Sequence, residues 1–516
     1  MTAALQPQSG ILFIAFGSRG DTQPLLVLAH SVSTDPTFTS CRVSFITHAA
    51  HMDWIGNLDL SPDLQYFWAN SDPFVLPHKV GSKQWIYRKP CLRVYSRLAI
   101  PSHSCISPTQ RAEQDASQRQ CCLSACQTLF AKVPAAARIG LRVCKQPGLI
   151  VYNLFSLEGF HLAEAFGLIS VAASPCAPPS SAPPGFWDAM AAEDPEFVSS
   201  LQASRLPFMR RGGCGDLVSR AHIHEWMWPL FADHWGVWRT AALNLPASPC
   251  QFDRTAAPML LLGISSLLCP ESSRSLTTAT MCGPWDIHSI QLHRGPEGWL
   301  HGPPSSPGSK PLLVDLGCSS RMLDLDQQQA FLELVGALAR KSTIGIHLSG
   351  SQLRLPELDT RVLEVGSLTQ DRRKCSHQKV HLHRDPVSHS HLLPSCCAIL
   401  HVGGAGTTLA AAKAGTPQLV APLHFDQEDW ACCVARTGIG IRIASLLDMV
   451  HRGTDQGRLD DEAESLAHAI QRLVRDPGVA QRCREMEQTL RGEDGVRAAL
   501  RVIERLLAEG SRVADG

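Results

Sequence analysis

The sequence lacks an excess of charge of either sign. Lys and Arg together number 47, as do Asp and Glu, so the net charge is zero with histidine neutral. Proteins that bind nucleic acid or anionic membrane surfaces usually carry a basic face large enough to shift this balance. The composition therefore predicts no nucleic-acid partner, and any phosphate site must be built from a few local groups.

The chain also lacks a long apolar segment, and its first residues lead us to expect no secretory signal. The apolar run 11–16 is too short for either, and the run 259–268 is interrupted by Gly and Ser and reaches only about half a membrane span, so it predicts a buried strand. No Asn-x-Ser/Thr sequon occurs, and the 19 cysteines do not form a small-domain disulfide pattern. These absences predict a cytoplasmic protein with reduced thiols, and they leave peripheral membrane contact open.

What the chain does contain is an alternation of strand and helix patterns. The apolar runs 11–16 and 312–317 each end in a glycine turn, and the helical patterns 25–32 and 327–340 follow them. Further strands are expected at 41–47, 149–152, 343–348, 361–365, 397–400 and 419–422, and further helices at 157–166, 408–414, 460–474 and 495–507. Such alternation predicts α/β domains with parallel sheets. We expect an N-terminal Rossmann-like domain over 1–250, a second over 255–490, and a closing helix and tail over 495–516.

A glycine-rich loop follows the apolar strand 398–400. It contains His401, Gly403, Gly404, Gly406, Thr407 and Thr408. Glycines let backbone amides approach an anion, a helix start adds positive potential, and hydroxyls add donors, so the loop suits a diphosphate. The alternative is a tight strand-to-helix turn without a ligand.

Two polar residues downstream strengthen the reading of the loop as a ligand site. Asp426 and Gln427 together offer acceptors and donors for several sugar hydroxyls. Trp430, which follows them, is interpreted as a packing residue.

Asp21 follows the first strand in the stretch 17–21, and a carboxylate held at a strand end can accept a proton. The alternative role is that of a turn or helix-cap aspartate, and the two are compatible. His48, after the second expected strand, either lines an acceptor site or is an ordinary core histidine.

Two patterns resemble metal sites. Asp324 and Asp326 have the spacing of a metal-binding Asp-x-Asp, but a helical pattern follows them and favours a helix cap. The Cys and His residues of 375–391 fit no closed four-ligand zinc site. We therefore predict no metal and no cofactor.

Residues 403–440 resemble the donor-binding signature of family-one glycosyltransferases, in particular sterol and lipid glucosyltransferases and bacterial antibiotic glycosyltransferases. That signature reads His-His-Gly-Gly-(Ala/Ser)-Gly-Thr-Thr, then Gly-x-Pro, then Asp-Gln. The matching residues are His401, Gly403, Gly404, Gly406, Thr407, Thr408, Gly415, Pro417, Asp426 and Gln427. Val402 stands at the second histidine, while Cys318 and His391 stand where relatives have serine and tryptophan. The stretch 17–24 is similar to the opening motif of the same group.

The resemblance implies a GT-B fold, in which two Rossmann-like domains face each other across a cleft. It implies an inverting, metal-independent transfer of a hexose such as glucose from a UDP-sugar co-substrate to a hydroxyl of a lipid, sterol or other small apolar acceptor. Asp21 would be the catalytic base. The implied donor-binding residues are Ser18, Gly20, His389, His401, Gly403, Gly404, Gly406, Thr407, Thr408, Asp426 and Gln427. A non-catalytic nucleotide-sugar-binding relative is the alternative, motivated by Val402, Cys318 and His391, and a phosphorylase or epimerase on the same fold is a further one.

Overall fold

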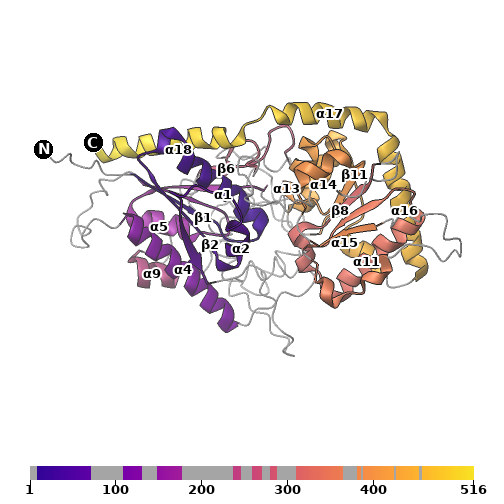
Figure 1. Cartoon of the computed structure of the whole chain (residues 1–516). Helices are drawn as coiled ribbons and strands as arrows, with labels where there is room; N and C mark the ends of the chain where they lie inside the picture. Colours follow the sequence, from indigo (N-terminus) through magenta and orange to yellow (C-terminus); the bar gives the residue numbers. More distant parts are fainter. Residues whose placement is uncertain are drawn as a thin grey trace, which may run out of the picture. The chain divides into compact units, whose positions relative to one another are not determined.

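The protein is built from two compact units, each formed around one parallel sheet (Figure 1). The computed structural model describes residues 9–70, 108–130, 148–176, 236–245, 259–269, 279–286, 310–351, 353–363, 380–384, 387–423, 426–452 and 456–515. Unit 1 comprises residues 1–266, 271–293 and 494–516, and unit 2 comprises residues 267–270 and 294–493. The predicted α/β class with two Rossmann-like domains is confirmed.

The sheet of unit 1 has seven strands in the order β3-β2-β1-β4-β5-β6-β7. The strands are β1 (Gly10–Ile14), β2 (Arg42–His48), β3 (Gln65–Ala69), β4 (Gly148–Tyr152), β5 (Ile169–Ser174), β6 (Leu260–Leu262) and β7 (Ala279–Met281). The helices are α1 (Arg19–Thr34), η1 (Pro36–Phe38), η2 (Ala49–His51), α2 (Met52–Ile55), α4 (Pro108–Phe130), α5 (Glu158–Phe166), α9 (Gly236–Leu243) and α18 (Gly495–Asp515). The strand order reverses between β1 and β4, and ligands of open parallel sheets bind at the carboxyl ends of strands at such a point.

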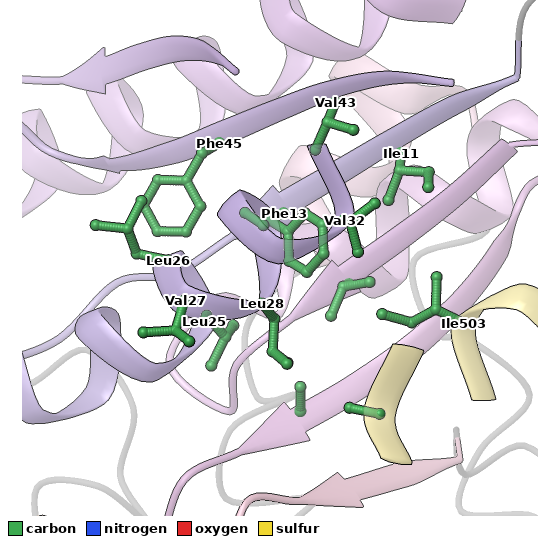
Figure 2. Packing of buried hydrophobic residues seen from close by; sticks show 14 of the residues in the cluster. Ile11, Phe13, Leu25, Leu26, Val27, Leu28, Val32, Val43, Phe45 and Ile503 are labelled. Carbon is green, nitrogen blue, oxygen red and sulfur yellow. The ribbon is translucent and has the colours of Figure 1, made fainter. Parts of the chain in front are cut away.

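The core of unit 1 joins both ends of the chain. Figure 2 shows Leu25 and Val32 of α1 with Phe13 of β1 and Ile503 of α18 in one cluster of fully or almost fully buried side chains. The closing helix predicted over 495–507 is therefore present, and it packs on unit 1. This packing anchors β1 and α1, and so the loop between them.

The sheet of unit 2 has six strands in the order β10-β9-β8-β11-β12-β13. The strands are β8 (Leu312–Asp315), β9 (Ile346–Ser349), β10 (Val380–His383), β11 (Ala398–His401), β12 (Gln418–Val420) and β13 (Gly440–Arg442). The helices are η9 (Gly317–Met322), α11 (Leu325–Lys341), η10 (Leu355–Glu357), η11 (Thr360–Leu363), α12 (His389–Leu392), η12 (Leu393–Ser395), α13 (Ala405–Lys413), α14 (Gln427–Thr437), α15 (Leu446–Arg452), α16 (Gln456–Arg475) and α17 (Pro477–Arg491). Here the order reverses between β8 and β11, and Leu313 of β8 and Ile399 of β11 pack with Ala411 of α13.

Two strand predictions were wrong in part. The segment expected as a strand at 361–365 begins as the helix η11, because the carboxylate of Asp359 accepts hydrogen bonds from the backbone and guanidinium of Arg361; residues 364 and 365 lie outside the described residues. The run expected as a strand at 259–268 pairs only over Leu260–Leu262. Across the part of the chain that the structure describes, no helix is long and apolar enough to cross a membrane.

Candidate functional site

The loop after β1 presents Asp21 in the first turn of α1. The backbone amide and the hydroxyl of Ser18 donate to Oδ2 of Asp21 at 2.8 and 2.7 Å. Burial raises the pKa of Asp21 to about 6, although both hydrogen bonds from Ser18 oppose this shift. Asp21 thus has the helix-capping contact that the sequence left open, and it also has a pKa suited to a base near neutral pH.

Side chains from two neighbouring strands hold the backbone of this loop. The amide of Gly17 donates to Nε2 of His48 at 2.9 Å, and Nε2 of His51 lies 3.0 Å from the Gly17 carbonyl oxygen. On the other side, Ser156 accepts from the amide of Phe16 at 3.0 Å, and Asn153 donates to its carbonyl oxygen at 2.6 Å. His48 is therefore a buried residue that holds the loop.

Sequence reasoning missed three of these loop contacts: His51, Asn153 and Ser156. All three follow the carboxyl ends of strands that flank β1 in the sheet. That position was the available signal, because polar residues just after neighbouring parallel strands converge at one edge of the sheet.

The loop between β11 and α13 has the backbone geometry of an anion site. Gly403 has φ +89°, and a Cβ atom there would lie 2.8 Å from the carbonyl oxygen of Gln427. Gly404 and Gly406 have no other atom within 4 Å of where a Cβ would lie, so the helix start has open space beside it. First-turn amides of a helix have no carbonyl partner within it, and they favour an anion at this place.

His401 lies beneath this loop and has a partner at each ring nitrogen. The Gly403 amide donates to its Nδ1 at 3.1 Å, so its Nε2 carries the proton and donates to Oε1 of Gln418 at 2.9 Å. Burial lowers the pKa of His401 to about 4, despite opposing effects of Gln418 and Asp315. The ring is thus neutral, and it supports the glycine turn from within the domain.

Two neighbours of the glycines in this loop also face inward. Val402 is buried, so the position that carries a second histidine in relatives holds an apolar side chain in the core. Thr408 is fully buried, and its hydroxyl donates to the carbonyl oxygen of Gly404 at 2.9 Å. Thr407 is only half-buried at the helix start. Of the two threonines, Thr407 is therefore the one at the open side.

Asp315 and His389 form a pair of which the sequence analysis predicted only His389 as a site residue. Nε2 of His389 lies 2.7 Å from Oδ2 of Asp315 at the end of β8, and the Gly317 amide donates to Oδ1 at 2.8 Å. Burial opposes ionisation of Asp315, but the hydrogen bond and charge of His389, with the Gly317 amide, lower its pKa below the usual value. His389 is thereby oriented by an ionised carboxylate, and Asp315 joins the candidate site.

Asp426 and Gln427 begin α14 and are both almost fully buried. Oδ2 of Asp426 accepts from the indole of Trp430 at 2.8 Å, and Trp430 is fully buried, which confirms its role in packing. The side chain of Gln427 donates to Ser319 at 3.0 Å and accepts from the Leu423 amide at 2.9 Å. These contacts tie Gln427 to the segments that follow β8 and β12, whereas Asp426 is held within α14 by Trp430.

The predicted residues therefore gather in two places. Ser18, Gly20 and Asp21 lie on the switch-point loop of unit 1, while the other predicted donor residues lie at the carboxyl ends of the strands of unit 2. Asp324 caps α11 by accepting from the Gln327 amide, which confirms the predicted helix cap. Cys375 and His377 lie outside the described residues.

Comparisons with known proteins bear on the family resemblance and on the fold. Residues 378–494 match the family described as erythromycin biosynthesis protein CIII-like, C-terminal domain. A terpene cyclase-glycosyl transferase fusion protein of Humicola fuscoatra is 37% identical over 132 residues, which are 25% of this chain and 10% of that protein. A sterol 3-beta-glucosyltransferase of Candida albicans is 20% identical over 496 residues, which are 96% of this chain and 27% of that enzyme.

Solved structures share the fold. The calicheamicin glycosyltransferase CalG4 is 17% identical, has a TM-score of 0.55, and the match covers 98% of this chain and 99% of that one. The chain thus spans about a tenth to a quarter of the two curated relatives, and nearly all of the solved structure. The resemblance to family-one glycosyltransferases of GT-B fold is confirmed.

Proposed function

We propose that this relative of family-one GT-B glycosyltransferases transfers a hexose such as glucose from a UDP-sugar to a hydroxyl of a sterol, lipid or other small apolar acceptor. The transfer inverts the anomeric centre and uses no metal. The observation that carries the proposal is the open glycine turn at the start of α13, in the segment 378–494 that matches the erythromycin biosynthesis protein CIII-like, C-terminal domain family. Its first-turn amides suit a diphosphate.

The proposed chemistry is a single displacement. Asp21 takes the proton of the acceptor hydroxyl, whose oxygen forms the new bond to the anomeric carbon. The bond from that carbon to the diphosphate oxygen breaks, and its electron pair leaves with UDP. The amides at the start of α13 and the Thr407 hydroxyl stabilise the leaving charge, as preorganised donors do in enzymes. Asp426 and Gln427 hold the sugar.

An apolar acceptor is supported by side chains next to the Asp21 loop. Met52 and Phe155 are 46% and 41% exposed, and they follow β2 and β4, the two strands beside β1. Exposed large apolar side chains at a switch point suit a ligand with apolar surface. The sterol 3-beta-glucosyltransferases among the relatives act on an acceptor of that kind by their names.

The test is a transfer assay with radiolabelled UDP-glucose and a panel of sterols, lipid alcohols and polyketide aglycones. Product formation that needs Asp21, with inverted anomeric configuration by NMR, supports the proposal. Calorimetry with UDP on the same protein distinguishes an active transferase from the alternative, a non-catalytic nucleotide-sugar-binding relative. Val402 places an aliphatic side chain where the family signature has a second histidine ring. A protein that binds UDP but transfers the sugar to no acceptor would be the non-catalytic relative.

A further inference from the structure

We propose that His48 and His51 clamp Gly17 from both sides and thereby set the position of Asp21. The two are positioning residues, not catalytic ones. This inference rests on the proposed function, because it concerns the base of that reaction. It assigns a role to two buried histidines that the transfer chemistry itself does not use.

The two histidines hold opposite groups of one residue. Nε2 of His48 accepts from the Gly17 amide at 2.9 Å, so that nitrogen carries no proton. Nε2 of His51 faces the Gly17 carbonyl oxygen at 3.0 Å, so that nitrogen must carry one. Both rings come from a short stretch at the end of β2 and in η2. One segment thus fixes both backbone groups of Gly17.

A displacement of Gly17 would be transmitted to Asp21. Gly17 has φ +107°, and a Cβ atom there would lie 2.8 Å from Oδ2 of Asp21, so the backbone and the carboxylate are in close contact. The next residue, Ser18, gives that oxygen both of its donors. Gly17 and Ser18 therefore connect the two histidines to the carboxylate of Asp21.

Ring contacts extend the clamp into a row. The ring of His48 lies 4.9 Å from that of Phe16 and 5.6 Å from that of His51, and His51 lies 5.8 Å from Trp54. The guanidinium of Arg19 lies 4.9 Å from the centre of the Trp54 ring. Such contacts stabilise side-chain orientation beyond the hydrogen bonds.

The protonation states keep the clamp closed while the base titrates. Burial, and secondarily the charge of His51, lower the pKa of His48 to about 3, whereas burial raises that of Asp21 to about 6. The acceptor nitrogen of His48 is thus retained throughout the pH range in which Asp21 gains and loses its proton. Arg19 contacts the row at Trp54, and the carboxylate of Asp21 lies beside Gly17 and Ser18.

The test compares three variants in the transfer assay. H48F keeps ring volume but removes the acceptor, and H48Q restores an acceptor of similar reach. H30F is the matched control, because Nδ1 of His30 likewise accepts a backbone amide, that of Ser61, at 3.0 Å in the same unit. Misplacement of a catalytic group by about 1 Å costs about 100-fold, so H48F should lower kcat roughly 10- to 100-fold. KM for the donor should change less than about twofold.

Two further measurements make the outcome decisive. H48Q should recover most of kcat, and H30F should keep it. Hydrogen exchange should show faster exchange of the Gly17 amide in H48F than in the wild type and in H30F. Unchanged kcat in a folded H48F, or an equal loss in H30F, would overturn the clamp while leaving the proposed function intact. A wild-type protein without transfer activity would overturn both.

Discussion

The loops after β1 and after β11 are built alike and carry opposite chemistry. Each follows a buried parallel strand where the strand order reverses, and each turns at a glycine with positive φ, +107° at Gly17 and +89° at Gly403. In both, the amide of that glycine donates to a buried histidine, His48 or His401. Burial lowers the pKa of these histidines to about 3 and about 4, so both are neutral acceptors.

The difference between the loops lies in the first turn of the helix that follows. The first turn of α1 contains Asp21, whereas that of α13 contains no acidic residue, and Gly404 at its N-cap and Gly406 within it lie beside open space. A carboxylate in the first turn occupies the positive end of the helix, and its absence leaves that end for an external anion. One scaffold can thus supply a proton acceptor in unit 1 and an anion site in unit 2.

The largest expected effect comes from removing the carboxylate of unit 1. D21N should lower the transfer rate about 1,000-fold, within the range of general-base contributions, and leave UDP affinity unchanged by calorimetry. An inactive variant that also fails to bind UDP would point instead to a folding defect.

The same substitution should not destabilise the protein. The pKa of Asp21 is raised from 3.8 to about 6 on folding, so the folded state binds more protons between these values and loses stability as pH rises through them. The D21N variant has no carboxyl group at this position, so it does not lose stability over this pH range. Its free energy of unfolding at pH 7.5 should therefore exceed that of the wild type by up to about 3 kcal/mol, with the difference vanishing near pH 4. Urea titrations at both pH values measure it.

The next effect comes from giving unit 2 the charge of unit 1. G406D adds a carboxylate to the first turn of α13, where the structure has space for it, and should weaken UDP binding about 10- to 100-fold through like-charge repulsion and loss of the anion site. G406N is the matched control, because it adds nearly the same volume without charge. If G406N weakens UDP binding as much as G406D does, the cause is steric blockage and not charge.

A third effect follows from the pKa of Asp21 alone. The base acts only when ionised, so kcat/KM for the acceptor should be constant above about pH 7 and fall about tenfold by pH 5. Steady-state rates across pH 5 to 8 give the profile. A profile flat to pH 5 would mean that Asp21 does not limit the reaction.

Sequence reasoning found the two loops because their signals are local. A buried strand, a glycine turn and a helix start are encoded within a dozen residues, and the donor loop in addition matches a long family pattern. The contacts from one element to another were not predictable in this way. His51, Asn153 and Asp315 lie far from their partners in the chain, so only the sheet order brings them together. The helix η11 was missed because the hydrogen bonds of Asp359 to Arg361 offer the backbone a local turn that an apolar pattern does not reveal.

The smallest expected effect concerns the carboxylate of Asp315, whose environment differs most clearly from that of Asp21. Asp21 has a serine as its partner and a raised pKa, whereas Asp315 pairs with His389 and has a lowered one. The lowered pKa means that Asp315 contributes stability above the unfolded value of 3.8 and that this contribution is lost as pH falls through the folded value.

D315N should therefore have the opposite stability effect to D21N. It should lower the free energy of unfolding at pH 7.5 by about 1–3 kcal/mol, since a charge-assisted hydrogen bond is lost, and the deficit should shrink in acid. UDP affinity should fall by less than about tenfold, because His389 is less firmly oriented while the amides of α13 are unchanged. A D315N protein as stable as the wild type at neutral pH would show that the carboxylate does not hold His389 in solution, and the contrast between a base in unit 1 and an orienting anion in unit 2 would then be lost.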